Sequence, residues 1–150
     1  MKDVFPIIPA GSATLWVLLA IGVLLLAGVA CFAFIAYSSR HSAVEVSDAG
    51  LRIQALFYGR EIPFSSLLTE AARPLDLSRE SEYAPVLRTN GIGLPGYSAG
   101  WFKLRNGQKA LAFVTDRRRV AMIPTRDKYL LMVSVPDPAA FLEALRRRTP

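Results

Sequence analysis

Cysteine and histidine are almost absent from this 150-residue sequence, which has one of each, Cys31 and His41. A single cysteine cannot form an internal disulfide, so there is no disulfide framework. Metal sites and nucleophilic active sites need clustered cysteine, histidine or carboxylate side chains, and no cluster with the required spacing occurs in the sequence. The sequence therefore predicts a protein that is not an enzyme, with no catalytic residue, no cofactor and no metal site.

Charge is absent from a long N-terminal stretch, residues 4–39. Within it, residues 13–37 lack the polar stripe that a surface helix of a soluble protein would show. At about 1.5 Å per residue, a helix of this length reaches roughly 37 Å, which exceeds the roughly 30 Å hydrocarbon core of a bilayer. We therefore predict a lead-in at residues 1–12, a single transmembrane helix at 13–37 and a linker at 38–42.

Two other interpretations of the apolar stretch fit the sequence less well. A cleaved signal peptide normally has an apolar region of about 7–15 residues behind a basic start, whereas this run is longer and Lys2 is offset by Asp3. A lipoprotein signal at Cys31 would normally have a large aliphatic residue three positions earlier, where this chain has Gly28. A buried, inert thiol within the membrane is the simpler interpretation of Cys31.

The net charge belongs to the rest of the chain, because Lys2 and Asp3 are the only charged residues before Arg40. The part from Arg40 onward therefore carries the whole formal charge of +6. A basic domain next to a bilayer is attracted to anionic lipid, by about 1 kcal/mol for each lysine or arginine close to the surface. Nucleic acid is the weaker alternative and is not expected, since no binding motif accompanies the charge. The basic residues that follow the apolar stretch favour a cytoplasmic C-terminal domain.

From residue 43 onward the hydrophobic period changes to two, which is typical of strands with one apolar face. Alternating runs at residues 44–47, 51–58 and 61–64 predict three short antiparallel strands joined by tight turns. Residues 65–88 have a weaker pattern, for which we expect a helical turn, a further short strand and an exposed polar loop.

A glycine-rich stretch, residues 88–100, contains Gly91-x-Gly93-x-x-Gly96, which matches the dinucleotide-binding fingerprint literally. That fingerprint binds a pyrophosphate only when a helix follows it, and the next segment here has a strand pattern. We therefore reject the nucleotide interpretation. Two alternatives stay open, an ordered loop beside a binding face and a plain structural connector.

Two hairpins are predicted after this stretch. Asn106 and Gly107 separate the strand-like runs 100–105 and 108–115, and Asn-Gly predicts a type I′ turn with positive φ at both residues. Strand-like runs at 120–124 and 129–135 form the second hairpin.

The last predicted element is a short helix at residues 137–148. Asp137 is suited to cap it and Pro138 to occupy its first position. Basic residues in its last turn complement the helix dipole.

Basic residues gather in two charged turns of the hairpin region. We name as candidate contacts for anionic lipid Arg117, Arg118, Arg119, Arg126 and Lys128. The alternative is that these are simply solvated turns, where charges normally lie.

The run at residues 129–135 is apolar on both faces, with Leu130 and Met132 on one of them. A strand with one solvated face should alternate. Either this is a central strand covered on both sides, or Leu130 and Met132 face outward and bind a partner protein.

Several segments resemble the bacterial PH-like (pleckstrin-homology-like) domain family over roughly residues 43–148. They are YGREIPF from Tyr58, RTNGIGLPGY from Arg88, GWF from Gly100, AFVTDR from Ala112 and DPAAFLEAL from Asp137. The resemblance implies an α+β, mainly-β domain at residues 43–150: an antiparallel barrel or sandwich of about seven strands with a C-terminal helix.

The resemblance implies a binding module and does not name a ligand, because fold does not fix function. Phosphoinositide-binding PH domains place basic residues around their first hairpin turn, whereas residues 47–50 of this chain contain one acid and no base. We expect a non-catalytic module tethered to a bacterial cytoplasmic membrane, with a protein partner as the first hypothesis and anionic lipid headgroups as the alternative.

Overall fold

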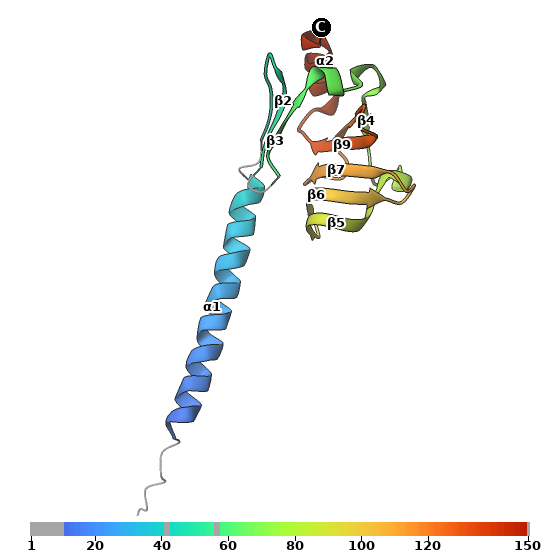
Figure 1. Ribbon diagram of the computed structural model, residues 1–150. Helices are drawn as coiled ribbons and strands as arrows, with labels where there is room; N and C mark the ends of the chain where they lie inside the picture. Colours follow the sequence, from blue (N-terminus) through green and yellow to red (C-terminus); the bar gives the residue numbers. More distant parts are fainter. Residues whose placement is uncertain (1–10, 41–42, 56–57, 150) are drawn as a thin grey trace, which may run out of the picture. The chain divides into compact units, whose positions relative to one another are not determined.

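The computed structural model describes residues 11–40, 43–55 and 58–149 (Figure 1). The chain divides between residues 37 and 38 into two units, an N-terminal helix and a β-rich domain, which are described separately. Residues 1–10 of the lead-in predicted at 1–12 and residues 41–42 of the linker predicted at 38–42 lie outside the described residues.

The N-terminal helix α1 spans Ser12–Arg40, so it includes residues 38–40, which were predicted as linker. Its apolar part, Ser12–Tyr37, has a mean hydropathy of 2.8, and none of the most apolar window is buried by the rest of the chain. The helix is therefore long and apolar enough to cross a membrane, a property that an N-terminal signal sequence shares.

The first three strands form an antiparallel sheet in chain order, as predicted. They are β1 (Ala43–Val46), β2 (Gly50–Gln54) and β3 (Arg60–Pro63). Cross-strand partners such as Val44 with Ile53 and Leu51 with Ile62 place the apolar side chains on one face. The end of the predicted strand 51–58 includes residues 56–57, which lie outside the described residues.

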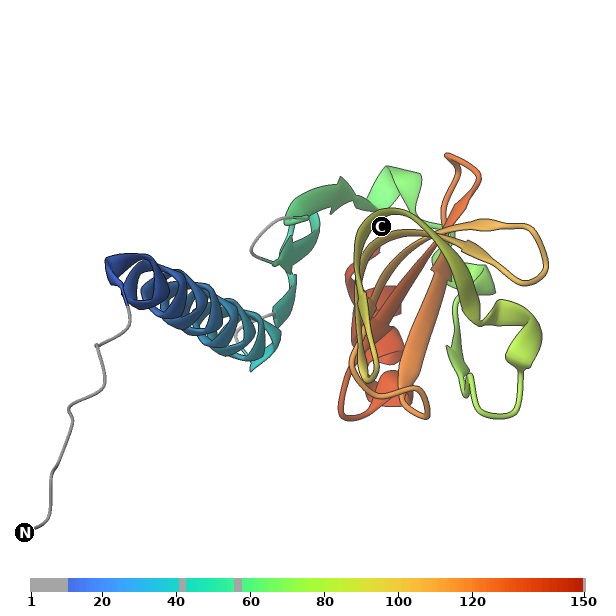
Figure 2. The same ribbon diagram turned by 90° about the horizontal axis from the view of Figure 1, so that it is seen from below.

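The other six strands form a second sheet in the order β4-β8-β9-β7-β6-β5. Figure 2 shows how strongly these strands bend. Their bounds are β4 (Arg73–Leu75), β5 (Pro85–Leu94), β6 (Tyr97–Leu104), β7 (Lys109–Val114), β8 (Val120–Pro124) and β9 (Tyr129–Ser134). Three short 3₁₀ helices, η1 (Phe64–Ser66), η2 (Thr69–Ala71) and η3 (Ser81–Tyr83), lie in the connections before β5.

The predicted fold, an antiparallel barrel or sandwich of about seven strands with a C-terminal helix, is confirmed as a sandwich with a C-terminal helix, and it differs from the prediction in two details. The described strands number nine and form two sheets that do not close into a barrel, so the PH-like sandwich is the observed alternative. In addition, β7 and β9 pair in parallel. The reason is topological: β8 leaves one strand position free beside β7, and β9 returns into that position to pair with both.

The hairpin predicted at Asn106 and Gly107 is present, but its turn type differs from the prediction. Gly107 has φ of +86°, whereas Asn106 has no positive φ. The Gly107 N–H donates to the Leu104 carbonyl, and the Leu104 N–H donates to the Gln108 carbonyl, so residues 105–107 form a three-residue loop. This loop is a type I turn completed by a left-handed glycine. The second predicted hairpin, β8–β9, is confirmed.

The C-terminal helix α2 spans Pro138–Arg148 and confirms the predicted helix. Its cap is Asp137, whose carboxylate accepts from the Ala140 N–H at 3.0 Å. Leu142 and Leu145 are buried, and the guanidinium of Arg146 donates to backbone carbonyls of η2 and Ala72. The helix is thus fixed against the domain by apolar contacts and by its basic last turn.

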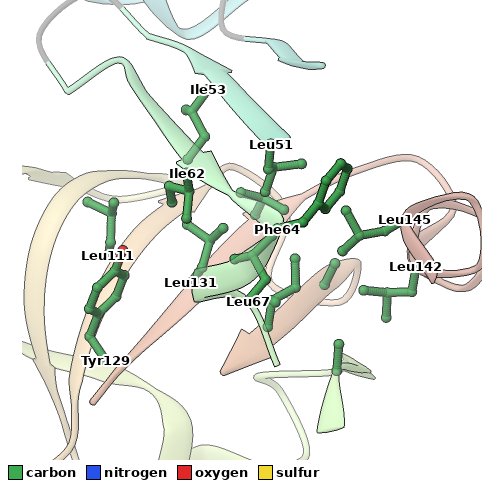
Figure 3. Close-up of a cluster of buried hydrophobic side chains, with 14 residues drawn as sticks. Leu51, Ile53, Ile62, Phe64, Leu67, Leu111, Tyr129, Leu131, Leu142 and Leu145 are labelled. Carbon is green, nitrogen blue, oxygen red and sulfur yellow. The ribbon is translucent and has the colours of Figure 1, made fainter. Parts of the chain in front are cut away.

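Buried side chains cover both faces of the six-stranded sheet. On β9, Tyr129, Leu131 and Val133 belong to a cluster that also contains residues of β2, β3 and α2 (Figure 3). Leu130 and Met132 point to the other face, into a second cluster with Leu75, Leu77, Phe102 and further residues of β6, β7 and β8. Because each face has its own cover, the central strands are apolar throughout.

Candidate functional site

The strand register defines two opposite ends of the six-stranded sheet. One end carries the β5–β6 turn near Pro95, the turn at residues 115–119 and the exit of β9 at Ser134. We call it the 115–119 end. The other carries the β6–β7 turn near Asn106 and the turn at residues 125–128, and we call it the 125–128 end.

The five candidate lipid contacts are divided between these ends. Arg117, Arg118 and Arg119 lie at the 115–119 end, whereas Arg126 and Lys128 lie at the 125–128 end. The five residues of β8 separate the two turns by about 17 Å. The structure therefore does not bring the five together as one patch, because successive turns of an antiparallel strand lie at its opposite ends.

Hydrogen bonds from Ser134, Leu77 and Val135 hold the backbone of the turn at residues 115–119. The Ser134 hydroxyl accepts from the N–H groups of Thr115 and Asp116, both at 3.1 Å, and donates to the Asp116 carbonyl. The Leu77 N–H donates to the Arg117 carbonyl at 2.8 Å, and the Val135 N–H donates to that of Arg119 at 3.2 Å. The turn is thus a fixed platform from which exposed arginine side chains project.

The charges around this turn are only partly compensated. Arg119 lies 3.4 Å from the Asp116 carboxylate, and Arg79 lies 3.7 Å from that of Asp76. Arg117 and Arg118 form no ion pair with any residue that the structure describes. Hydrogen bonds from the Ser78 hydroxyl and N–H, with smaller contributions from nearby Arg79 and Arg118, lower the pKa of Asp76.

A cavity of about 230 Å³ opens between the two sheets at the 115–119 end. Ala43, the first residue of β1, lies at its edge. A neighbouring hollow of about 210 Å³ shares four lining residues with the cavity and includes Arg119. Most of the residues that line the cavity are apolar, and the whole lining is Ala43, Val44, Ile53, Tyr97, Phe113, Thr115, Val133, Ser134, Val135 and Pro136.

The glycine-rich stretch forms the hairpin of β5 and β6, so neither alternative, an ordered loop or a plain connector, describes it. Gly91 pairs with Gly100 across the two strands. A Cβ atom on Gly100 would lie 2.5 Å from the Asn90 carbonyl oxygen, which explains why this close approach needs glycine. A strand, β6, follows the fingerprint in place of a helix, as the sequence indicated.

Of the two alternatives for Leu130 and Met132, the one in which they face outward and bind a partner is wrong, because both side chains are buried. Leu130 is 8% exposed and Met132 is 0% exposed. Residues 75–83 supply much of the cover through Leu77 and Tyr83, and this segment had no periodic pattern that would have predicted it. The strand is central, which was the other alternative.

Three large apolar side chains of β5 are exposed instead, which the sequence did not indicate. Val86 is 55% exposed, Leu87 is 56% exposed and Leu94 is 40% exposed. β5 is an edge strand that pairs only with β6, with register shifts after Pro85 and after Arg88. The signal in the sequence was weak because Val86 and Leu87 fall in a region without clear alternation.

A second feature that sequence reasoning missed is a group of cations around Trp101. The Lys109 ammonium lies 4.5 Å from the centre of the indole ring, and the Arg60 guanidinium lies 5.8 Å from it. Tyr129 meets the same ring edge-on at 5.0 Å. Cation–π attraction accounts for the two basic side chains, so this group has a structural explanation of its own.

The described residues thus form a two-sheet sandwich with a C-terminal helix, in which charged turns and the edge strand β5 are exposed. A family model described as Bacterial PH domain matches residues 42–149. The chain therefore belongs to the bacterial PH domain family. Membership of this family supports a general role as a binding module. Comparisons with curated proteins and with solved structures gave no match.

Proposed function

We propose that the protein is a membrane-tethered, non-catalytic binding module whose 115–119 end contacts anionic lipid headgroups. The observation that carries this proposal is that the basic turn and the first residue of the domain lie at the same end of the sheet. Arg117, Arg118 and Arg119 lie at the end of the domain where Ala43 also lies, and Ala43 begins the domain after α1.

The length of the connection supports this role. Arg40 ends α1 and Ala43 begins β1, so their Cα atoms are at most about 11 Å apart. With α1 spanning a bilayer, the edge of the cavity at Ala43 stays near the headgroups, and so does the turn beside it. Arg40 is itself basic and favours the cytoplasmic side, where the leaflet is anionic.

The expected strength is moderate and fits reversible contact. Arg117 and Arg118 have no ion pair to lose on binding a phosphate, and each contributes about 1 kcal/mol near an anionic surface. The first hairpin turn, around Asp48, offers no base, so the proposed contact differs from the usual phosphoinositide pocket.

Spin labels at the two ends of the sheet test the proposal. Cysteine is introduced at Pro95 or at Asn106, both exposed, in full-length protein in which Cys31 is replaced by alanine. In nanodiscs containing phosphatidylglycerol, we expect the label at position 95 to be accessible to oxygen dissolved in lipid. We expect the label at position 106 to be accessible to a water-soluble nickel reagent.

The comparison has an internal control, because the two labels differ only in the end of the sheet that they report. In nanodiscs of neutral phosphatidylcholine alone, the label at position 95 should become more accessible to water. Equal water accessibility of both labels in anionic nanodiscs would show that the 115–119 end does not contact the membrane.

A second candidate function is binding of a partner protein along β5. This edge strand presents unpaired backbone groups together with exposed Val86 and Leu87, a combination that suits an extended segment of another protein adding a strand. It retains the protein-partner hypothesis but moves it from β9 to the sheet edge.

Replacing Leu87 by aspartate tests this second candidate. The charge should leave folding intact, since Leu87 is 56% exposed, but should remove a partner that packs on β5. We expect a partner that co-purifies with full-length protein from native membranes to be lost. The matched control is Leu68→Asp, at a residue that is 38% exposed and lies outside β5. A partner retained by Leu87→Asp would exclude the β5 edge.

A further inference from the structure

The cavity at the 115–119 end has the chemistry of a site for hydrocarbon. Aliphatic and aromatic side chains from both sheets line it, with Val44 and Ile53 on the small sheet and Phe113 and Val133 on the large one. Its volume of about 230 Å³ is below the roughly 300–1,000 Å³ of sites that enclose whole small molecules. It therefore suits one apolar segment of a longer ligand.

Polar side chains, those of Tyr97, Thr115 and Ser134, also line this cavity. The adjoining hollow is lined by Thr115, Asp116 and Arg119, together with residues that it shares with the cavity. The Asp116 carboxylate accepts from the Arg118 N–H and pairs with Arg119, so its charge is partly offset. The Ser134 hydroxyl is fully used in holding the turn. Among the residues that line the hollow, Arg119 is the basic one and can meet an anion.

We propose that this cavity binds a segment of an acyl chain, next to the glycerol, of an anionic phospholipid whose phosphate lies in the adjoining hollow beside Arg119. The inference rests on the proposed contact between this end and the membrane, and it adds a lipid site inside the domain to that contact. An apolar lining beside a cationic rim matches an amphiphile of this kind in both its parts.

The position of Ala43 indicates the source of the ligand. Ala43 lines the cavity and follows Arg40 by three residues, so the opening stays within reach of the bilayer surface when α1 spans it. Moving a methylene group from the bilayer interior to an apolar protein cavity exchanges one hydrocarbon environment for another. Burial of the same group from water gains about 0.8 kcal/mol, so a chain segment at the interface prefers the cavity to solvent.

Photolabelling of the full-length protein tests the inference. The protein is placed in nanodiscs whose phosphatidylglycerol carries a diazirine in the half of one acyl chain that is nearer the glycerol. After illumination, peptide mapping should find adducts on β7 near Phe113 and on β9 near Val133, in addition to adducts on α1. Adducts confined to α1 would overturn the inference.

A variant that fills the cavity gives a second readout. Ala43 is exposed and lies at the cavity edge, so Ala43→Trp should occupy the space without disturbing the core. We expect at least a tenfold loss of adducts on β7 and β9. The control is Ala49→Trp, an equally large change at an exposed position in the β1–β2 turn, which should label as the wild type does. Unchanged labelling of Ala43→Trp, with an unchanged melting temperature, would exclude the cavity.

Failure of this inference is distinguishable from failure of the proposed function. If the spin label at position 95 contacts lipid but no adduct forms on β7 or β9, the membrane contact stands and the acyl-chain site is wrong. If the label at position 95 faces water, the membrane contact itself is wrong. The site then has no route to a bilayer lipid.

Discussion

Replacement of Met132 by aspartate is expected to prevent the β domain from folding. Met132 is 0% exposed and lies on β9, between β7 and β8 in the middle of the six-stranded sheet. Arg73 is half-buried, and the other basic residues of the domain that the structure describes are exposed. None of them lies in this core to pair with the new carboxylate. An unpaired buried charge together with the lost packing costs more than about 4 kcal/mol, out of a total stability of about 5–15 kcal/mol.

The measurement is thermal unfolding of the full-length protein in detergent, followed by the far-ultraviolet circular dichroism of its strands. Met132→Leu serves as the control, since this nearly isosteric change usually costs less than about 1.5 kcal/mol. A Met132→Asp variant that melts like the wild type would contradict the burial of this residue. It would also restore β9 as a candidate surface for a partner.

The ambiguity at β9 shows where sequence reasoning reaches its limit. A strand that is apolar on both faces must be covered on both, but periodicity does not say whether the cover belongs to the same chain or to another. Here Leu77 and Tyr83 supply part of it, from a segment without a regular pattern. That contact is fixed by the tertiary fold.

Local signals were sufficient for the elements themselves. Alternation predicted β1, β2 and β3, and the capping residues Asp137 and Pro138 predicted α2. These features depend on neighbours within a few residues in the sequence. The family resemblance added the sandwich, which the family comparison confirms.

Long-range pairing could not be predicted in the same way. The parallel pairing of β7 with β9 depends on β8 leaving one strand position free, which no local pattern records. The cavity at the 115–119 end depends on how two sheets separated in sequence pack together. The division of the five basic residues, in contrast, follows from the predicted strand between their turns, since a strand places its two ends apart.

Neutralising Arg117 and Arg118 has the second largest expected effect. At about 1 kcal/mol for each arginine near an anionic surface, Arg117→Gln with Arg118→Gln should weaken docking of the 115–119 end by about 2 kcal/mol, or about 30-fold. Neither side chain has an ion pair within the described structure, so folding should change little. The control is Arg126→Gln with Lys128→Gln, which removes the same charge from the opposite end.

The most direct test of the account is hydrogen–deuterium exchange of these two variants and the wild type, full-length, in nanodiscs with and without phosphatidylglycerol. If the 115–119 end contacts the membrane, anionic lipid should slow exchange at residues 94–97 and 115–119 in the wild type and in the Arg126/Lys128 variant. This protection should be lost in the Arg117/Arg118 variant. Equal protection in both variants, or protection at residues 125–128 instead, would contradict the claim that the 115–119 end contacts the membrane.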